Sequence, residues 1–291
     1  MIDTSFLESI TKFKIAMRNK TSMNMSGNRK SSQKGNSTEF SGFREYVHGD
    51  DPRKIDWNAY GRLNKLYIKE YMEEKESTVR ILIDTSSSMD YGTKSKAELA
   101  LKLALCFSYM AITNMDKVML VDLKNPMHPY KCSGGKKSIP LLLNWLNKLE
   151  FNGDINLSEV CFSLDSYGSG VTILISDFLN EDIIDDASVI GKILRYFTYQ
   201  KHSTNLVHIL SSEELNVTLE GNLNLIDSEN NTSLKVSMDN KSIINYEKRL
   251  NDFILSLKNE ANKNGNNYGL IDTGLSFDQI IYEKLRFMYD F

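Results

Sequence analysis

The feature that most constrains the fold of this chain is a short apolar run followed at once by oxygen-bearing side chains. Residues 78–90 read TVRILIDTSSSMD, and the apolar members of the run are Val79, Ile81, Leu82 and Ile83. A run of this kind is typical of a strand that is buried on both faces of a parallel sheet. A helical pattern of apolar residues follows at 94–114. The sequence therefore predicts a carboxylate and several hydroxyls where a central strand ends and a helix begins, an edge at which α/β sheets bind ligands.

The rest of the chain repeats this alternation of strands and helices. Further apolar strands are expected at 117–123, 171–176, 205–210 and 267–272, and helices at 139–149, 157–164, 185–199, 243–263 and 276–288. This rhythm predicts a mainly parallel sheet covered by helices on both faces. Residues 215–238 break it with two alternating segments around an Asn-rich turn, which we interpret as an inserted antiparallel β-hairpin.

The first 75 residues have a different character, so we expect two parts: an N-terminal extension, 1–75, packed on a core domain, 76–291. Residues 3–18 place Phe6, Ile10 and other apolar side chains at helical spacing, which predicts a short docked amphipathic helix. Residues 18–34 hold five basic residues and no acid. This loop is either a solvated surface or a patch for a polyanion or an acidic partner.

Residues 39–76 combine Arg, Asp, Trp and Tyr in an irregular segment that ends in a half-exposed strand. We expect a loop held by ion pairs, because guanidinium and carboxylate groups match as forks. Specifically, Trp57 is predicted to be buried, and at least one arginine is predicted to pair with an aspartate, from the sets Arg44, Arg53 and Arg62, and Asp50, Asp51 and Asp56.

The same segment carries a family resemblance. It reads F-x-x-x-R-x-Y-x-x-G-D-D-x-R-x-I-D-W-x-x-x-x-R, on Phe40, Arg44, Tyr46, Gly49, Asp50, Asp51, Arg53, Ile55, Asp56, Trp57 and Arg62. This run resembles the signature of the bacterial family called domain of unknown function 58, and the resemblance extends over about residues 26–291. It implies a von Willebrand factor A-like, Rossmann-like domain after the signature. It also implies a partnership with MoxR-type AAA+ ATPases in assembling or remodelling other proteins.

The loop after the first strand is the candidate site. Taken by itself, DTSSSM is either a Ser-rich turn with a helix N-cap or a set of oxygen ligands for a divalent cation, with Asp84, Ser86 and Ser88 at alternate positions. The spacing resembles a metal-ion-dependent adhesion site. That resemblance assigns Asp177 as a further ligand and implies binding of Mg²⁺, Mn²⁺ or Ca²⁺, which we expect to be weak because one ligand of the pattern is missing.

One position departs from the pattern of that site. Ile155 stands where the family has a threonine, and its side chain supplies no oxygen. Asp154 or Asn156 could substitute through a shifted loop. The alternative is a degenerate site in which backbone amides and hydroxyls hold Asp84.

Composition limits the classes of function. A net charge of −3 gives no overall attraction to nucleic acid, and three scattered cysteines fit reduced thiols. The chain has no run of about 18 apolar residues and its first residues are unlike a secretory signal, so we expect a cytoplasmic protein without a transmembrane segment.

The leading hypothesis is a non-enzymatic protein-interaction module, in which a metal at the sheet edge binds an acidic side chain of a partner. No catalytic residue is assigned, because the sequence has no Walker loop, nucleophile elbow or Cys-x-x-Cys pair. The alternatives are a metal-dependent hydrolase that uses Asp84 and Asp177, and a structural scaffold with an inactive metal site.

Overall fold

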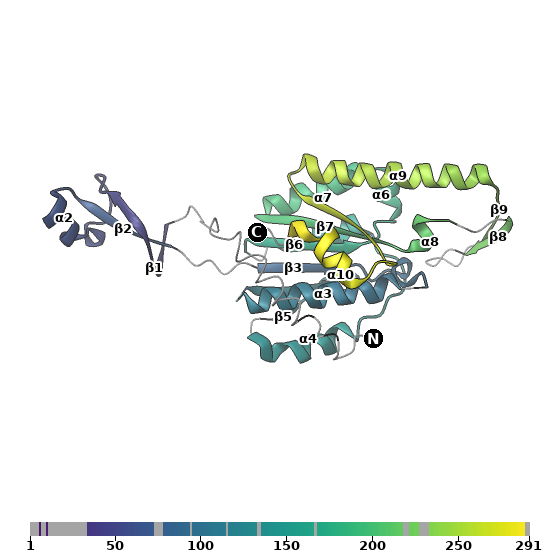
Figure 1. Ribbon diagram of the computed structural model, residues 1–291, viewed down its shortest axis with the longest axis horizontal. Helices are drawn as coiled ribbons and strands as arrows, with labels where there is room; N and C mark the ends of the chain where they lie inside the picture. Colours follow the sequence, from purple (N-terminus) through teal and green to yellow (C-terminus); the bar gives the residue numbers. More distant parts are fainter. Residues whose placement is uncertain are drawn as a thin grey trace. The chain divides into compact units, whose positions relative to one another are not determined.

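The computed structural model describes residues 6, 10, 34–72, 78–93, 95–114, 116–132, 135–165, 168–217, 221–226 and 233–288 (Figure 1). The chain divides into two compact units. The smaller unit is Ala16–Glu76, and the larger unit is Met1–Ile15 together with Ser77–Phe291. Among the helices of the described residues, none is both long enough and apolar enough to cross a membrane.

The larger unit is built on a six-stranded sheet with the order β10-β7-β6-β3-β4-β5. All neighbouring strands pair in parallel except β4 and β5, which are antiparallel. β5 is a short strand at one edge of the sheet. The predicted mainly parallel sheet is confirmed, in the Rossmann-like arrangement expected of a von Willebrand factor A-like domain. The strands are β3 (Thr78–Ile83), β4 (Lys117–Asp122), β5 (Tyr130–Cys132), β6 (Gly170–Ser176), β7 (His202–Leu210) and β10 (Asn267–Asp272).

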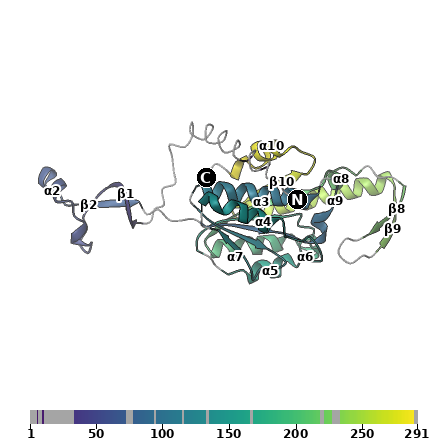
Figure 2. The ribbon, with the colours of Figure 1, turned by 90° about the horizontal axis from the view of Figure 1, so that it is seen from below.

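Helices cover both faces of this sheet (Figure 2). Because side chains alternate along a strand, Leu82, Leu174 and Leu206 of three neighbouring strands share one face. They form a buried cluster with residues of α5, α7 and α9, while α3, α4 and α10 lie on the opposite face. The helices are α3 (Lys96–Thr113), α4 (Ile139–Leu146), α5 (Leu157–Ser163), α6 (Glu181–Asp185), α7 (Ser188–Tyr199), α8 (Ser212–Leu215), α9 (Asn240–Lys263) and α10 (Phe277–Gln279).

Two residues of the predicted N-terminal helix are described, and both are helical. Phe6 packs edge-on against Phe277 with ring centroids 4.9 Å apart, and the Lys102 ammonium lies 5.8 Å from the Phe6 ring. Ile10 is buried. These contacts agree with a helix that docks on the larger unit.

The predicted hairpin follows β7 and α8. β8 (Gly221–Ile226) and β9 (Ser233–Met238) pair in antiparallel register. The 24-residue helix α9 then leads back to β10, and its first half extends beyond the sheet (Figure 1). Only Leu257 and Ala261 of α9 are fully buried, in the half that packs on α7.

The smaller unit is a two-stranded antiparallel sheet with a short helix. β1 (Lys34–Glu45) pairs with β2 (Tyr67–Met72), and between them lie a 3₁₀ turn at Pro52–Lys54 and α2 (Trp57–Leu63).

The acidic residues of the smaller unit hold its turns. The Arg44 guanidinium binds both oxygens of Asp50, at 2.5 and 2.6 Å, so the predicted Arg–Asp pairing is confirmed. Asp51 caps the 3₁₀ turn and Asp56 caps α2, each by accepting hydrogen bonds from backbone amides. Asp56 also pairs with Lys69 at 3.2 Å.

The prediction that Trp57 is buried is wrong. The Trp57 side chain is 64% exposed and packs edge-on against Tyr60, one helical turn away. Trp57 is the first residue of a seven-residue helix that buries none of its residues. The charged residues near Trp57 therefore form hydrogen bonds of turns and helix caps. Such hydrogen bonds do not require that an aromatic ring shield them from solvent.

We predict that Asp50→Ala loosens the turn between β1 and α2, because Asp50 Oδ2 also accepts a hydrogen bond from the Val47 amide at 2.9 Å. Loss of this partly buried acceptor and of the guanidinium pair should cost about 1–3 kcal/mol. Hydrogen exchange at the Val47 amide should accelerate. In the control, Glu45→Gln removes the exposed pair with Lys65 and should leave that exchange rate unchanged. Equal acceleration in both variants would contradict the assignment.

Candidate functional site

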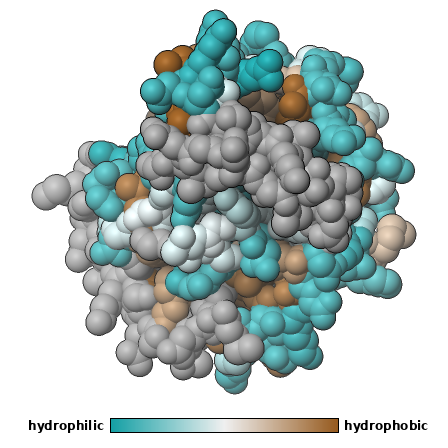
Figure 3. Space-filling view, turned by 90° about the vertical axis from the view of Figure 1, so that its right-hand side faces the viewer, coloured by the Kyte–Doolittle hydropathy of each residue, from teal (hydrophilic) through white to brown (hydrophobic). Residues whose placement is uncertain are grey.

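The candidate site lies at the edge of the sheet where the parallel strands end. Several of these strands end in a carboxylate: Asp84 follows β3, Asp122 ends β4, Asp177 follows β6 and Asp272 ends β10. Figure 3 views the molecule from this side, where the described surface is mostly hydrophilic with small separate hydrophobic patches. The fold thus gathers acidic groups from distant parts of the chain.

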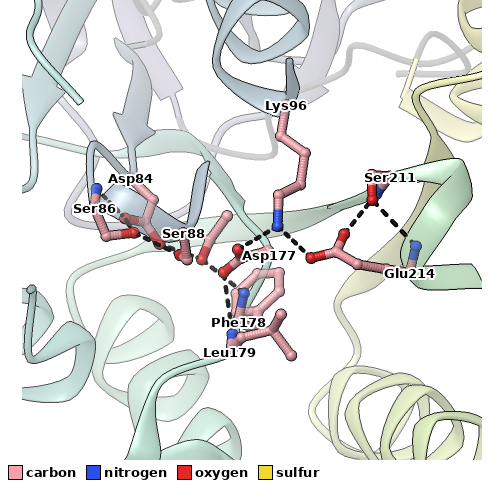
Figure 4. Close-up of polar contacts among 10 residues, drawn as sticks. Asp84, Ser86, Ser88, Lys96, Asp177, Phe178, Leu179, Ser211 and Glu214 are labelled. Carbon is pink, nitrogen blue, oxygen red and sulfur yellow. Dashed lines mark hydrogen bonds and ion pairs between the residues drawn. The ribbon is translucent and has the colours of Figure 1, made fainter. Parts of the chain in front are cut away.

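Asp84 is fully buried, and its carboxylate is held by neighbouring donors (Figure 4). Oδ1 accepts hydrogen bonds from the backbone amide of Ser86 at 3.0 Å and from its hydroxyl at 2.7 Å. Oδ2 accepts a hydrogen bond from the Ser176 hydroxyl at 2.5 Å. Burial, and next the negative charge of Asp177, raise the pKa of Asp84 to about 6, although these hydrogen bonds act in the opposite direction.

The structure brings three of the predicted ligands together. The hydroxyl oxygens of Ser86 and Ser88 lie 3.0 Å apart, and Ser86 also donates to Asp84. The three side chains therefore bind one another. This is the pattern expected of a carboxylate that is held by an amide and hydroxyls.

Asp177, the fourth predicted ligand, lies beside them on the loop after β6 (Figure 4). Its Oδ1 accepts a hydrogen bond from the Leu179 amide at 3.1 Å. The intervening Phe178 is buried and has a φ of 55°, a left-handed conformation that is uncommon for a bulky residue. The Phe178 amide donates a hydrogen bond to Ser176 Oγ at 2.8 Å. The end of β6 therefore provides the hydroxyl that binds Asp84 and also carries Asp177 itself.

The second oxygen of Asp177 binds Lys96, a residue that the sequence analysis missed. The Lys96 ammonium is fully buried and lies 2.8 Å from Asp177 Oδ2 and 2.7 Å from Glu214 Oε1. Burial opposes its charge, but the carboxylates of Asp177 and Glu214 outweigh burial and raise the pKa of Lys96. Lys96 is therefore a fixed cation at neutral pH.

Glu214 reaches Lys96 from the first turn of α8. Its other oxygen, Oε2, accepts a hydrogen bond from the Ser211 amide at 2.6 Å, and the Ser211 hydroxyl accepts one from the Glu214 amide. The Ser-x-x-Glu spacing of this capping box is visible in the sequence and predicts a helix start. It does not reveal that the same carboxylate binds Lys96, because that contact spans 118 residues.

The loop at 152–156 contacts the Asp84 loop through its backbone groups. Ile155 is buried in the core, and its carbonyl accepts a hydrogen bond from Asn180. Asn156 caps α5 by accepting from the Glu159 amide, and Asp154 Oδ1 accepts from the adjacent Ile155 amide. Both side chains that could substitute for the missing threonine oxygen are thus engaged in local hydrogen bonds.

The residues present do not fit a divalent cation as they stand. Such an ion needs several oxygens free to face it, commonly one or two carboxylates with hydroxyls and waters. Here Asp84 and the two serines are bound to one another, and Asp177 is bound to a permanent ammonium. Metal binding by Asp84, Ser86, Ser88 and Asp177 therefore stays a prediction.

His208 of β7 is buried near this network, as expected for a core residue. Burial lowers its pKa to about 3, and its Nδ1 shares a 2.6 Å hydrogen bond with the hydroxyl of Tyr268. An enclosed imidazole with so low a pKa is a poor general base, because an efficient one has a pKa near the working pH.

The fold and this edge define a Rossmann-like α/β domain with a carboxylate–serine loop at the ends of its strands. The chain belongs to the family described as protein of unknown function DUF58, which matches residues 42–252. The family expected from the sequence is confirmed.

Relatives and solved structures resemble parts of the chain. Uncharacterized proteins of Mycobacterium tuberculosis and Mycobacterium bovis are 21% identical over 204 residues, which cover 67% of this chain and 62% of theirs. The structure of the conserved hypothetical protein BatB from Bacteroides thetaiotaomicron is 12% identical with a TM-score of 0.41, over 74% of this chain and 100% of that one. An aerotolerance-related membrane protein from Bacteroides fragilis is 13% identical with a TM-score of 0.38, over 73% and 100%.

We predict that Ser176→Ala destabilises the larger unit far more than Ser88→Ala. Ser176 donates to Asp84 and accepts from the Phe178 amide, so its removal leaves two buried polar groups unsatisfied. The expected cost is about 1–3 kcal/mol, against less than about 0.5 kcal/mol for the partly exposed Ser88. Urea unfolding followed by Trp145 fluorescence, in a Trp57→Phe background, measures both. A larger cost for Ser88→Ala would contradict this description of the site.

Proposed function

We propose that this chain is a non-enzymatic protein-interaction module that acts with a MoxR-type AAA+ ATPase. The observation that carries the proposal is the state of the edge residues: every carboxylate and hydroxyl of the Asp84 loop is used in internal hydrogen bonds or ion pairs. No activated nucleophile results from this arrangement, and the nearby His208 is enclosed. The chemistry of the described residues thus supports binding rather than turnover.

The surface of the smaller unit gives further support for an interaction role. It exposes several large apolar side chains between residues 43 and 63, and side chains of this kind serve as anchors in protein interfaces. Its exposed apolar residues are Phe43, Val47, Trp57, Tyr60 and Leu63. We name this set the aromatic cluster. The class of partner rests on the family resemblance alone.

The test of the proposal is direct binding of the purified chain to a MoxR-type ATPase from the same source, measured by biolayer interferometry. Trp57→Ala should weaken binding roughly tenfold or more, because truncating an anchor residue commonly costs at least about 1.4 kcal/mol. Tyr199→Ala is the matched control, since Tyr199 is an exposed aromatic residue at the end of α7 in the larger unit. It should bind like the wild type.

Two results of this experiment would count against the proposal. Failure of the wild type to bind would remove the ATPase as the partner class. Equal loss in Trp57→Ala and Tyr199→Ala would show that the aromatic cluster is not the binding surface.

The hydrolase hypothesis makes a separate prediction. If Asp84 and Asp177 hydrolysed substrate with a divalent metal, the protein with Mg²⁺ or Mn²⁺ would cleave a generic phosphate ester and Asp84→Asn would abolish it. We expect the wild type and Asp84→Asn to show the same background rate. Turnover that depends on Asp84 would replace the interaction proposal with an enzymatic one.

A further inference from the structure

The Lys96 ammonium has an unusual position for a cationic side chain. Lys96 is the first residue of α3, and long side chains on a helix point back toward its N-terminus. The side chain therefore reaches the sheet edge beside the Asp84 loop, where its nitrogen lies between Asp177 and Glu214 (Figure 4). It is fully buried, whereas lysine is almost always exposed unless it is paired.

We propose that Lys96 is the built-in cation of this edge: its ammonium takes the place beside Asp177 that a divalent metal ion takes in a metal-ion-dependent adhesion site. The proposal is independent of the partner proposed above. It accounts for the disagreement between the ligand pattern in the sequence and the contacts in the structure.

The first support is that an ammonium can meet the same chemical need beside Asp177 as a metal ion. Two carboxylates that approach each other in a buried place need a positive charge or several donors between them. An ammonium supplies one positive charge and three donors, and two of these donors have acceptors at hydrogen-bond distance. Asp84, which lies farther from Lys96, is held by hydroxyl and amide donors instead.

The second support is the missing ligand. Ile155 brings no oxygen to the edge, and the backbone of its loop packs directly on the Asp84 loop. Ser87 donates from its amide to the Gly153 carbonyl at 2.9 Å, and the Asn152 amide donates to the Thr85 carbonyl at 3.0 Å. A lysine that neutralises Asp177 makes both the metal and the threonine oxygen unnecessary.

Lys96 also links the sheet edge to α8, which a metal held by Asp84 and Asp177 alone would not do. Through Glu214 it connects the start of α3 and the end of β6 to α8, which precedes the hairpin. Thr93 donates to the adjacent Glu213 across the same junction. The lysine thus joins three strand-end segments in one permanent, metal-independent contact.

The experiment is a titration of Mn²⁺ and Mg²⁺, followed calorimetrically, into four proteins. The wild type should show no binding at millimolar concentration, whereas Lys96→Met should bind with a dissociation constant on the order of 1 mM or tighter. Lys96→Met/Glu214→Gln keeps an oxygen ligand but removes one uncompensated charge, so it preserves the test if the single variant does not fold. Lys102→Met is the control, since Lys102 lies on the same helix and pairs with Glu98 away from the edge. It should behave like the wild type.

A measurement on the unaltered protein completes the test. In ¹⁵N NMR of the lysine side chains, one ammonium should be protected from solvent exchange, absent in Lys96→Met, and unchanged by added Mg²⁺. Metal binding by the wild type that is lost in Asp84→Ala, or displacement of the ammonium signal by Mg²⁺, would overturn the proposal. So would a folded Lys96→Met or double variant that binds no metal.

Discussion

A parallel sheet brings the carboxyl ends of its strands to one edge, and in this chain several of those strands end in an aspartate. Carboxylates that lie close together and are partly buried repel one another and lose hydrogen bonds to water. Each therefore needs hydrogen-bond donors or a positive charge from the protein. The loops at this edge are arranged to supply them. Asp84 accepts hydrogen bonds from one amide and two hydroxyls, and Asp122 accepts them from Thr85 and from the Lys124 amide. Asp272 accepts hydrogen bonds from Ser212 and from the Gly274 amide. Asp177 accepts them from the Leu179 amide and from the Lys96 ammonium.

The tightest of these loops follows β6. Phe178 adopts a left-handed backbone conformation that costs on the order of 1–3 kcal/mol for a residue of its size. The conformation allows Ser176 to reach Asp84 while the next residue, Asp177, reaches Lys96. Hydrogen bonds to two buried carboxylates offset the strain, and the burial of the Phe178 ring against His208 adds apolar packing.

The smaller unit uses its residues in the opposite way. Arg44, Asp50, Asp51 and Asp56 stabilise its turns and helix caps, while several large apolar side chains of its described residues lie on the surface. A unit of this size buries little apolar area and gains little stability from a core. The exposed aromatic cluster is the surface that the proposed interaction would use.

The sequence by itself determined most elements of the larger unit: buried strands from β-branched runs, helices from apolar spacing, and the hairpin at the break in rhythm. It also indicated the family, from the segment around Asp50 and Trp57. It did not predict β1, β5 or α2. It also placed Asp84 and Asp177 at one edge, because strand ends in a parallel sheet must meet. Only the tertiary structure showed that Lys96 and Glu214 complete this edge. Both lie in ordinary helix-start patterns, and a contact between residues 118 positions apart follows from the packing of α3 and α8, not from any local period. Exposure of Trp57 was likewise decided by packing, since a sequence shows which residues are apolar but not whether a short helix has anything to bury them against.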